Sequence, residues 1–600
     1  MTAAAPTITD ADGNAAVTNT PPLRPRERLA VVAILMVHAA LLAYSGAVHS
    51  PAWDEVGHLP AGIAHWQTGV FDLYRVNPPL VRLSATLLPF ITGARLDFDG
   101  ATLSGPPWRR SEFISGESWI RADATGFLHH LRLARWSVIP FSLWAGWLCF
   151  AAARRLYGVA SGFVALALWC TSPMVLGHGS LITPDVAAAA TGAFALWSLA
   201  NWVSVPSRRH LVIAAVALGL ALLTKFTNLL LLGMLAVLMV YRCIRPGEAQ
   251  PKHSRWCLQG IAIALIALYV IAFGYGFERM GKRLGDFQFV SDTFSGSQPG
   301  KELHGNRFTG AMLGSLPVPL PENYLLGIDV QKRDFEAQMP SYLRGEWRRG
   351  GWWHYYLYAF VIKEPLATLA LLLAAFVQLP FLPRAQRGLT LLWVILPIVV
   401  IFAFVSTQTG FNHHLRYVMP AYPFVYVLAS SLVANRPATV RWQSLVAVVL
   451  GLMAAAESLS AYPHSMVFFN QAVGGPDAGW RHLNHSNVDW GQNVLQLAEW
   501  AREHPEARPL QVIFSGGFDP KYLPIWDRTV THGDLTEAET ALLKEGRLQD
   551  RWVAISVNKL VDTDPQRDRY GTLQTREPEA KVAYTYYVYN LKSLKEETQP

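Results

Sequence analysis

The stretch LAVVAILMVHAALLAYSGAVHSPAWDE, residues 29–55, decides the class of fold, because an apolar run of membrane-spanning length ends on two adjacent carboxylates. Residues 29–49 contain no Asp, Glu, Lys or Arg, and a helix of about 20 apolar residues crosses a bilayer. Trp53 is of the aromatic type that gathers at membrane interfaces, which places Asp54 near the level of the lipid headgroups. Asp54 and Glu55 therefore stand where the first membrane helix leaves the bilayer.

The rest of the chain repeats this pattern. Of its 600 residues, 51% are hydrophobic and only 16% charged, whereas a soluble globular domain carries about 25% charged residues. The run at 211–241 is too long for one crossing and is interrupted by TKFT, so we expect two short helices with a tight turn. Together with the first helix, these runs predict about eleven crossings; the others lie at 133–152, 159–176, 185–203, 257–275, 355–380, 388–405, 418–434 and 443–461.

The loops predict the orientation, because Lys and Arg in short loops mark the cytoplasmic side. The short loops assigned to the outside, 177–184, 224–227 and 406–416, carry only Lys225 and Arg416 between them. Asp54 and Glu55 then face outward, in a multi-pass protein of the bacterial inner membrane whose N-terminus is cytoplasmic. With the N-terminus inside, every cytoplasmic segment is basic: 24–28, 153–158, 207–210, 242–256, 383–387 and 435–442.

The chain divides into three parts by composition. Residues 1–28 are rich in Ala, Thr and Pro and predict a disordered cytoplasmic tail. Residues 29–461 form the membrane domain, with outer loops at about 50–132 and 276–353. Residues 462–600 lose the membrane composition and alternate strand-like and amphipathic runs, which predicts a small periplasmic α/β domain. The strand-like runs are LQVIFSGG, RWVAISVN and KVAYTYYVYN, and the amphipathic runs are NVLQLAEWAREH and TEAETALLKEG.

Charge and cysteine content exclude other classes. The net charge of +8 follows from the membrane topology, and the sequence shows no basic stripe on a soluble face of the kind that binds nucleic acid. The cysteines lie in membrane helices or on the cytoplasmic side, so we expect no disulfide in the outer segments and see no metal-type spacing; they are Cys149, Cys170, Cys243 and Cys257.

Lys225 and Arg416 need partners, because an ionisable residue at membrane depth is costly alone. A lipid phosphate would supply one, bound by Arg in a bidentate fork and by Lys as a point charge. The alternatives are an ion pair with a nearby carboxylate or a side chain that snorkels to water. His413 and His414 precede Arg416, but two adjacent histidines without a third ligand do not predict a metal site.

The segment HGSLITPDVAA presents Thr183 and Asp185 where the fourth membrane helix begins. Both residue types favour helix starts, so each either caps the helix or contacts a substrate. In YRVNPPLVRL, Pro78 and Pro79 should end one segment and start a short helix. Asp489, ahead of NVLQLAEW, predicts a helix N-cap.

In combination, these motifs resemble the dolichyl-phosphate-mannose protein mannosyltransferase family, glycosyltransferase family 39, which includes bacterial aminoarabinose transferases of lipid A. The resemblance covers about residues 29–500 and implies an all-α polytopic GT-C membrane fold. It rests on WDE (53–55), NPPL (77–80), TPD (183–185), LTKFT (223–227), HHLRYVMPAYP (413–423), YLRGEWRRGGWWHYYLYAFVIKEPL (342–366) and FFNQAVGGPDAGWRHLNHSNVDWGQNVLQLAEW (468–500).

The resemblance implies transfer of a sugar from a polyprenyl phosphate to an acceptor hydroxyl on the outer face. Asp54 matches the family's catalytic carboxylate, and a carboxylate within about 3 Å of a hydroxyl can take its proton as it attacks. Glu55 either shares this role, orients Asp54 or is a solvated neighbour.

The leaving phosphate needs cations, for which Arg416, Lys225 and Lys363 are the candidates, with Asp185 and His414 as further substrate contacts. Relatives commonly carry Lys or His before the Pro pair, whereas this chain has Asn77, which puts a contact at that position in doubt; Arg75 is a possible substitute.

The sequence leaves several partners and cofactors open. The acceptor is a protein Ser or Thr, lipid A or an envelope glycan, and membrane lipids surround the chain. No cofactor is required by the sequence, although Asp54, Glu55 and Asp185 could hold a divalent cation such as Mg²⁺ or Mn²⁺. The alternative function is a lipid or sugar transporter or flippase, which should carry ionisable residues at mid-membrane, whereas here they gather at the outer surface.

Overall fold

The structure is a computed structural model that describes residues 22–97, 109–244, 253–296, 304–434, 441–561 and 568–592. Most of the expected N-terminal tail and parts of two expected cytoplasmic loops, 242–256 and 435–442, lie outside the described residues.

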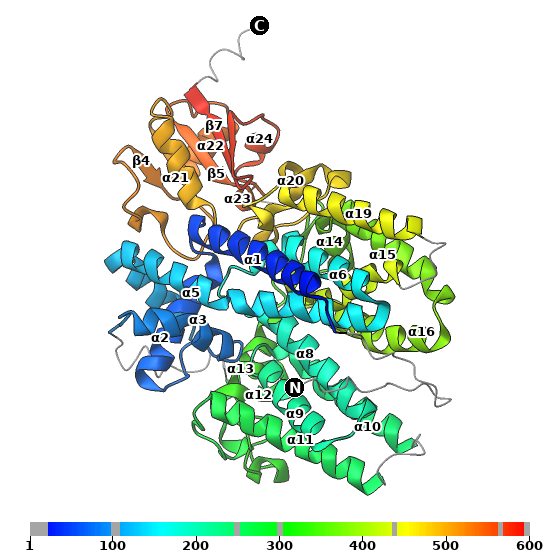
Figure 1. Ribbon diagram of the computed structural model, residues 1–600. Coiled ribbons are helices and arrows are strands. Elements are labelled where there is room, and N and C mark those ends of the chain that lie inside the picture. The colour runs from blue at the N-terminus through cyan, green and yellow to red at the C-terminus, as the bar shows by residue number, and fades with distance from the viewer. Residues whose placement is uncertain are drawn as a thin grey trace.

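The protein is mostly helical (Figure 1). Among the described residues, six helices are long and apolar enough to cross a membrane, or seven if one bent pair counts as a single span. The expected number of about eleven is therefore not reached by length and composition, although each predicted run is helical over most of its length. The helices in these runs are α1 (Pro25–Val48), α5 (Ser111–Tyr157), α6 (Val159–Thr171), α8 (Asp185–Ser204), α9 (Arg208–Leu222), α10 (Leu230–Ile244), α11 (His253–Gly274), α14 (Tyr355–Lys363), α15 (Leu366–Gln378), α17 (Leu396–Thr407), α18 (Tyr422–Ala429) and α19 (Arg441–Leu459).

Two of the predicted runs are interrupted, of which only the one at 211–241 was expected to be, whereas 355–380 was predicted as a single crossing. The run at 211–241 is two helices, as predicted: α9 ends at Leu222 and the 3₁₀ helix η1 (Phe226–Leu229) leads into α10. The run at 355–380 is broken, since α14 and α15 meet at an angle of 115°. Pro365 explains the break, because proline lacks an N–H and forces the residue before it out of the helical region.

The first outer segment forms two short helices, α2 (Trp53–Thr68) and α3 (Leu80–Ile91). Pro79 stands at the N-cap of α3, where the Pro pair was expected to start a helix. Both helices pack on the first half of α5, which bends at Asp123. Buried side chains of α2, among them Val56 and Leu59, belong to this layer.

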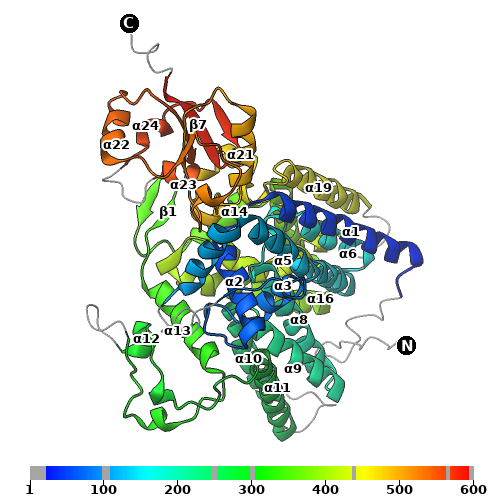
Figure 2. The ribbon, with the colours of Figure 1, turned by 90° about the vertical axis from the view of Figure 1, so that its left-hand side faces the viewer.

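The second outer segment contains α12 (Asp292–Ser295), α13 (Glu322–Glu336), β1 (Ser341–Leu343) and β2 (Glu346–Arg348). Figure 2 shows it rising from the end of α11 toward the C-terminal part of the chain. The backbone N–H of Arg344 donates to the His482 carbonyl oxygen at 3.0 Å, so the tip of this hairpin touches the segment that leads into the C-terminal sheet.

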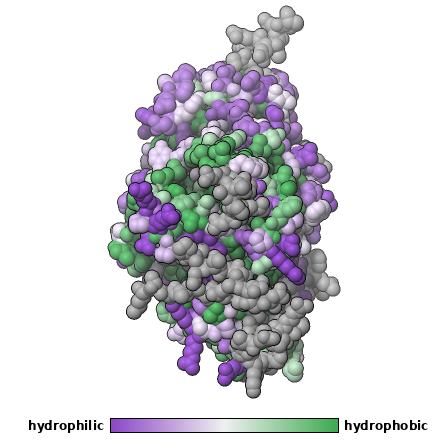
Figure 3. Space-filling model, turned by 45° about the vertical axis from the view of Figure 1, so that its right-hand side comes forward, coloured by the Kyte–Doolittle hydropathy of each residue, from purple (hydrophilic) through white to green (hydrophobic). Residues whose placement is uncertain are grey.

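The C-terminal residues form a five-stranded mixed sheet in the order β4-β3-β5-β7-β6. Strand β3 runs parallel to β4 and β5, and β7 is antiparallel to β5 and β6. In Figure 1 this sheet lies at the top, above α1 and α5, and Figure 3 shows its surface mostly hydrophilic above a zone with hydrophobic side chains. The elements are α21 (Val494–Glu503), β3 (Leu510–Ile513), β4 (Val530–His532), α22 (Glu537–Lys544), β5 (Trp552–Ser556), α23 (Val557–Leu560), α24 (Gly571–Gln574), β6 (Ala580–Val582) and β7 (Tyr586–Asn590).

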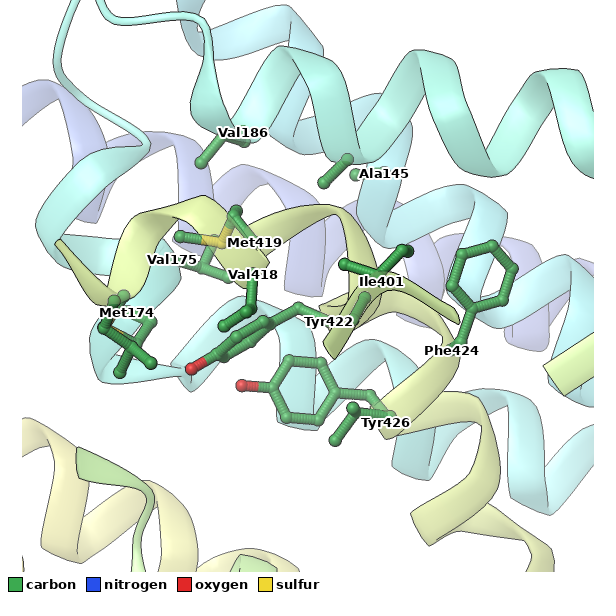
Figure 4. Close-up of a cluster of buried hydrophobic side chains, with 14 of the residues drawn as sticks. Ala145, Met174, Val175, Val186, Ile401, Val418, Met419, Tyr422, Phe424 and Tyr426 are labelled. Atoms are coloured by element: carbon green, nitrogen blue, oxygen red, sulfur yellow. The ribbon is translucent and has the colours of Figure 1, made fainter. Parts of the chain in front are cut away.

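The membrane part is held by a core of close-packed apolar side chains. Figure 4 shows its centre, where Val186 of α8 lies near Val418 and Met419 of the 3₁₀ helix η7 (Leu415–Ala421), with Tyr422 of α18 beside them. This packing joins the start of α8 to η7 and so places two charged residues, Asp185 and Arg416, next to each other.

Glu55 forms a buried ion pair with Arg135 of α5. The Arg135 guanidinium also donates to the carbonyl oxygens of Gly46, His49 and Ser50 at 2.7–3.0 Å. Glu55 in turn accepts the N–H of Ala52 at 2.9 Å. One arginine thus satisfies the last carbonyls of α1 and fixes the start of α2, so the connection between the two helices is rigid.

Replacing Glu55 by Gln leaves the Arg135 guanidinium as a buried charge without its carboxylate, which costs about 3–5 kcal/mol. We expect Glu55→Gln to lower the free energy of unfolding by this amount in a denaturant titration of the detergent-purified protein. The double variant Glu55→Leu, Arg135→Met removes both charges and should recover part of the loss. Glu537→Gln, on the exposed face of α22, is the control; a Glu55→Gln variant as stable as this control would contradict the assignment.

Candidate active site

A cavity of about 460 Å³ opens where α2, the start of α8, η7 and the C-terminal sheet meet. We call it the outer cavity. It brings together residues from many distant parts of the sequence, including Asp54, Lys225 and Arg416, which the sequence had singled out by their charge. Its lining comprises Trp53, Asp54, Tyr74, Val76, Asn77, Arg110, Phe113, Pro184, Lys225, Gln331, Asp334, Met339, Phe411, His413, His414, Arg416, Tyr417, His485, Asp489, Trp490, Ser515 and Asn558.

Two carboxylates and two cations alternate beside the outer cavity. Arg416 donates to Asp54 at 2.8 Å and to Asp185 at 3.2 Å, one nitrogen to each. Lys225 pairs with the other oxygen of Asp185. Ion pairs with nearby carboxylates, which were one of the expected alternatives for Lys225 and Arg416, are thus present. The carboxylates are Asp54 and Asp185, both of which the sequence had singled out.

Asp54 differs from Asp185 in its exposure. The Asp185 side chain is fully buried and both of its oxygens are engaged, whereas 21% of the Asp54 side chain is exposed to the cavity. Only one Asp54 oxygen accepts a hydrogen bond from the described residues. Asp54 therefore has a free oxygen that faces the cavity, which is what a proton acceptor needs.

Aromatic rings hold the two cations in place. The Arg416 guanidinium lies 4.2 Å from the centre of the Trp490 ring, and the Lys225 ammonium lies 4.9 Å from that of Tyr417. Cation–π contacts of this kind stabilise a partly desolvated charge. Trp490 belongs to the segment before the C-terminal sheet, so both halves of the protein build the charged wall.

Local sequence explains why Asp185 is here. Pro184 is the N-cap of α8 and Asp185 its first residue, where a negative charge is favoured by the helix dipole. Neither Thr183 nor Asp185 caps the helix, because α8 has no side-chain capping hydrogen bond. Asp185 pairs with cations instead.

Three predicted site residues lie elsewhere. Glu55 is not a solvated neighbour of Asp54 and does not line the outer cavity, because Arg135, Ala52 and Ile182 occupy its carboxylate. Arg75 pairs with Asp72 and donates to Asn323 at 2.8 Å, away from the cavity lining.

Lys363 is buried under the cavity wall, where its ammonium donates to the carbonyl oxygens of Met466 and Asn487. These contacts fix the segment after α19 to the end of α14, so Lys363 has a positioning role and does not reach the outer cavity.

Asn77 and His414 do line the outer cavity. Asn77 has a φ of 65°, in the left-handed region that Asn tolerates, and its buried side-chain oxygen has no hydrogen-bond partner among the described residues. His414 bonds Ser486 at 2.6 Å, and His413 stacks on His485 with ring centres 4.0 Å apart. Burial lowers the pKa of His413 to about 4, so this stack is uncharged at neutral pH.

Arg110 was not expected in the site. It stands over the rings of Tyr74 and Phe113 and pairs with Glu112 and Asp334. Its position in the sequence gave no signal, because outer loops as long as 50–132 do not exclude basic residues in the way that short loops do. Arg110 adds a third cation to the cavity lining.

Asp489 does not cap α21, as the sequence had suggested; the N-cap residue is Asn493. Its carboxylate instead accepts hydrogen bonds from the Ser556 hydroxyl and from the Gly491 N–H, the latter at 2.9 Å. Asp489 thus ties the connecting segment to the end of β5. Burial raises its pKa to about 6 from the usual 3.8.

An apolar groove of about 160 Å³ adjoins the outer cavity and shares Lys225, Gln331 and Tyr417 with it. Phe404 of α17, whose side chain is 43% exposed, forms part of its rim. The groove therefore leads from the membrane-facing surface to the charged wall. Its remaining lining is Phe226, Thr227, Leu229, Ile328, Lys332, Phe335, Val405 and Gln408.

The described part of the chain contains no group of three or more His, Cys, Asp or Glu side chains arranged to hold an ion. The proposed carboxylate set of Asp54, Glu55 and Asp185 is not assembled, because Glu55 turns to Arg135. The two remaining carboxylates are bridged by Arg416.

Residues 127–273 match the model of the family described as Dolichyl-phosphate-mannose-protein mannosyltransferase. This stretch runs from α5 to α11 and contains Asp185 and Lys225. The family predicted from the motifs is confirmed over this stretch, and the enzyme class that it indicates is a glycosyltransferase. A comparison with curated protein sequences finds no match.

Among solved structures, the chain is similar to ArnT from Cupriavidus metallidurans in the apo state, with 14% identity, 95% of this chain and 99% of that chain covered, and a TM-score of 0.44. The same protein bound to undecaprenyl phosphate gives 14% identity, coverage of 94% and 98%, and a TM-score of 0.42. The chain is also similar to the Archaeoglobus fulgidus oligosaccharyltransferase in the apo form, with 11% identity, 88% of this chain and 69% of that chain covered, and a TM-score of 0.38.

The raised pKa of Asp489 predicts how stability depends on pH. Because the folded state binds this proton more tightly than the unfolded state, the stabilisation is present below about pH 4 and is lost as the pH rises through about 6. A shift of this size corresponds to roughly 2–4 kcal/mol. We expect the Asp489→Asn variant to gain stability relative to the parent protein between pH 4 and pH 7, measured by denaturant titration; a difference independent of pH would contradict this.

Proposed function

We propose that this protein is a membrane glycosyltransferase of the GT-C type that transfers a sugar from a polyprenyl phosphate to an acceptor hydroxyl, with Asp54 as the catalytic base. One observation carries the proposal: Asp54 presents a free oxygen to a cavity whose wall holds Arg416 and Lys225 and which joins an apolar groove. The description of the matching family names dolichyl-phosphate-mannose, which is a polyprenyl-phosphate sugar, and this supports a donor of that class.

The donor fits the two connected spaces by its chemistry. Its phosphate belongs beside Lys225 and Arg416, where the groove meets the outer cavity, with Arg110 as a third cation in the lining. Its polyprenyl chain belongs in the apolar groove, whose rim at Phe404 faces outward from α17. Transfer of apolar surface from water into such a groove is favourable.

The reaction is a displacement at the anomeric carbon. The acceptor hydroxyl forms the new C–O bond while Asp54 takes its proton. The bond between the anomeric carbon and the phosphate oxygen breaks, and the electron pair leaves with the polyprenyl phosphate. Lys225 and Arg416 stabilise the charge that grows on this oxygen. A single displacement inverts the configuration of the anomeric carbon.

The topology belongs to the same proposal. Residues 29–461 form the membrane domain with eleven crossings, including the shorter apolar helices α6 and α10 and the broken pair α14–α15. The N-terminus is cytoplasmic and residues 462–600 are periplasmic, in the inner membrane of a bacterium. The basic cytoplasmic loops of the sequence support this orientation.

Asp54→Asn keeps the shape of the side chain and its hydrogen bond to Arg416 but removes the proton acceptor. We expect sugar transfer to fall by roughly two orders of magnitude or more. The measurement is transfer of label from a panel of radiolabelled polyprenyl-phosphate sugars to a membrane extract that contains acceptors, by the reconstituted protein.

Two controls accompany this measurement. Asp527→Asn changes a half-exposed aspartate of the C-terminal part and should leave transfer unchanged. Binding of the unlabelled donor should persist in Asp54→Asn, which separates a chemical defect from a binding defect. Equal transfer by the parent protein and Asp54→Asn would refute the role of Asp54, and lipid movement across the vesicle without transfer would favour a flippase.

The apolar groove predicts a dependence on the length of the lipid. Leu229→Trp places a large side chain in the groove, and we expect it to slow transfer from a long polyprenyl donor about tenfold or more. A donor with a short prenyl chain should be affected less, because it occupies less of the groove. Leu232→Trp, on an exposed face of the following helix α10, is the matched control. Equal slowing with both donors would place the lipid elsewhere.

A further inference from the structure

The C-terminal sheet turns one particular edge toward Asp54. Ser515 follows the end of β3 by two residues and Asn558 follows the end of β5 by two residues, and both line the outer cavity. Strands β3 and β5 are parallel neighbours, so their carboxyl ends lie side by side. After β3 the chain continues to β4 on one side, and after β5 it continues toward β7 on the other.

This is the arrangement that creates ligand crevices in open α/β sheets. Where the connections of adjacent parallel strands leave in opposite directions, a crevice forms outside their carboxyl ends and binds ligands. Here the crevice opens into the outer cavity rather than to solvent alone. We call it the β3–β5 crevice, formed by Ser515 and Asn558 together with His485 of the connecting segment.

The crevice is fixed against the catalytic helix. A side chain at Gly517 would meet the carbonyl oxygen of Trp53 at 3.0 Å, so the loop after β3 lies directly on the first residue of α2. Phe518 and Leu523 continue this contact by packing in one cluster with Val56. Groups bound at Ser515 are therefore held next to the residue that precedes Asp54.

Two buried polar atoms in the crevice have no hydrogen-bond partner among the described residues. They are Oδ1 of Asn558 and Nε2 of His485. The Asn558 amide is oriented by its nitrogen, which donates to the Asp489 carbonyl oxygen at 2.6 Å. Buried polar atoms without partners are rare in folded proteins and costly, so each calls for a ligand or water.

The crevice has the chemistry of a site for a neutral hydroxyl-rich ligand. Ser515 offers a hydroxyl and Asn558 an amide oxygen. Burial lowers the pKa of His485 well below its usual value, so its ring is neutral and offers one donor and one acceptor. The Trp53 ring, 43% exposed, provides a flat apolar face of the kind that an amphipathic ligand covers.

Its charge disfavours an anionic ligand. None of the three crevice residues is Lys or Arg, and the neighbouring Asp489 also lines the outer cavity. The cations of the cavity lining, Lys225, Arg110 and Arg416, come from other segments of the chain and are the groups proposed above for the donor phosphate.

We infer that the β3–β5 crevice is the acceptor subsite and that it takes a neutral carbohydrate, whose hydroxyl it presents to the free oxygen of Asp54. This inference rests on the proposed glycosyltransferase activity and specifies its acceptor. The membrane part then binds the donor through charge, and the C-terminal sheet selects the acceptor through hydrogen bonds. A site built to hydrogen-bond a hydroxyl discriminates strongly against ligands that leave its polar groups unpaired.

The test compares acceptors and uses the full-length protein in nanodiscs. Transfer of label from the donor is measured to three probes: neutral methyl glycosides and disaccharides, peptides containing Ser and Thr, and a phosphorylated glucosamine disaccharide. Ser515→Ala, Asn558→Ala and the double variant are compared with Thr575→Ala, which removes an exposed hydroxyl from the same part of the chain. Hydrolysis of the donor by water is measured in parallel.

We expect transfer to neutral saccharides, with KM raised about tenfold in each single variant and more in the double variant. The ratio of sugar transfer to donor hydrolysis should fall in the same variants. Thr575→Ala should match the parent protein in both KM and this ratio. Transfer only to peptides or only to the phosphorylated probe would overturn the inference. An unchanged KM in both single variants would also overturn it, as would transfer and hydrolysis falling in equal proportion.

A binding measurement separates this inference from the proposed reaction. Asp54→Asn should still bind the neutral disaccharide that serves as acceptor, detected by saturation-transfer NMR, and adding Ser515→Ala and Asn558→Ala should abolish the signal. If the parent protein turns over no donor but this binding and its loss are observed, the proposed function fails and the carbohydrate site stands. If donor turnover depends on Asp54 but no saccharide binds, the proposed function stands and the carbohydrate site fails.

Discussion

The buried ion pair between Glu55 and Arg135 determines where Asp54 points. Consecutive residues of a helix project about 100° apart, so two adjacent carboxylates cannot serve the same site. Arg135 holds Glu55 inward and satisfies the last carbonyls of α1 with its remaining N–H groups, and Asp54 is thereby turned to the outer cavity. The adjacent pair in the sequence is thus one residue that anchors the helix and one that lines the outer cavity.

The alternation of charges around Arg416 explains how so many ionised groups coexist at the edge of a membrane. Asp54, Arg416, Asp185 and Lys225 form a chain in which each charge contacts an opposite one, and the sum is zero. A buried ion needs such a partner because its desolvation is costly. Asp54 is one end of this chain and its most exposed member, so it retains an accessible oxygen, whereas both oxygens of Asp185 are engaged by cations.

The sequence indicates the membrane class and the interruption of the run at 211–241, but not the break at Pro365. It also indicates the four members of this chain, because charges are scarce near outer membrane surfaces and each one stands out. The sequence does not separate Glu55 and Lys363 from these four residues. The direction of the Glu55 side chain depends on Arg135, 80 residues away, and that of Lys363 depends on carbonyl oxygens of a distant segment. Ser515 and Asn558 are ordinary polar residues in the sequence. Only the strand order of the sheet brings them together.

The two walls of the outer cavity differ in a way that orients a reaction. The wall from α8 and η7 carries cations and continues into an apolar groove, whereas the wall from the C-terminal sheet carries neutral hydrogen-bonding groups. A lipid phosphate and a hydroxyl-rich acceptor would each be poorly matched to the other's wall, because a phosphate gains from cations and a neutral hydroxyl gains from paired donors and acceptors. Asp54 lies on the boundary, joined to the first wall through Arg416 and to the second through the contact of Trp53 with Gly517. In the proposed reaction, a hydroxyl held by the sheet and an anomeric carbon held by its phosphate would therefore meet at the Asp54 oxygen that accepts no hydrogen bond from the described residues.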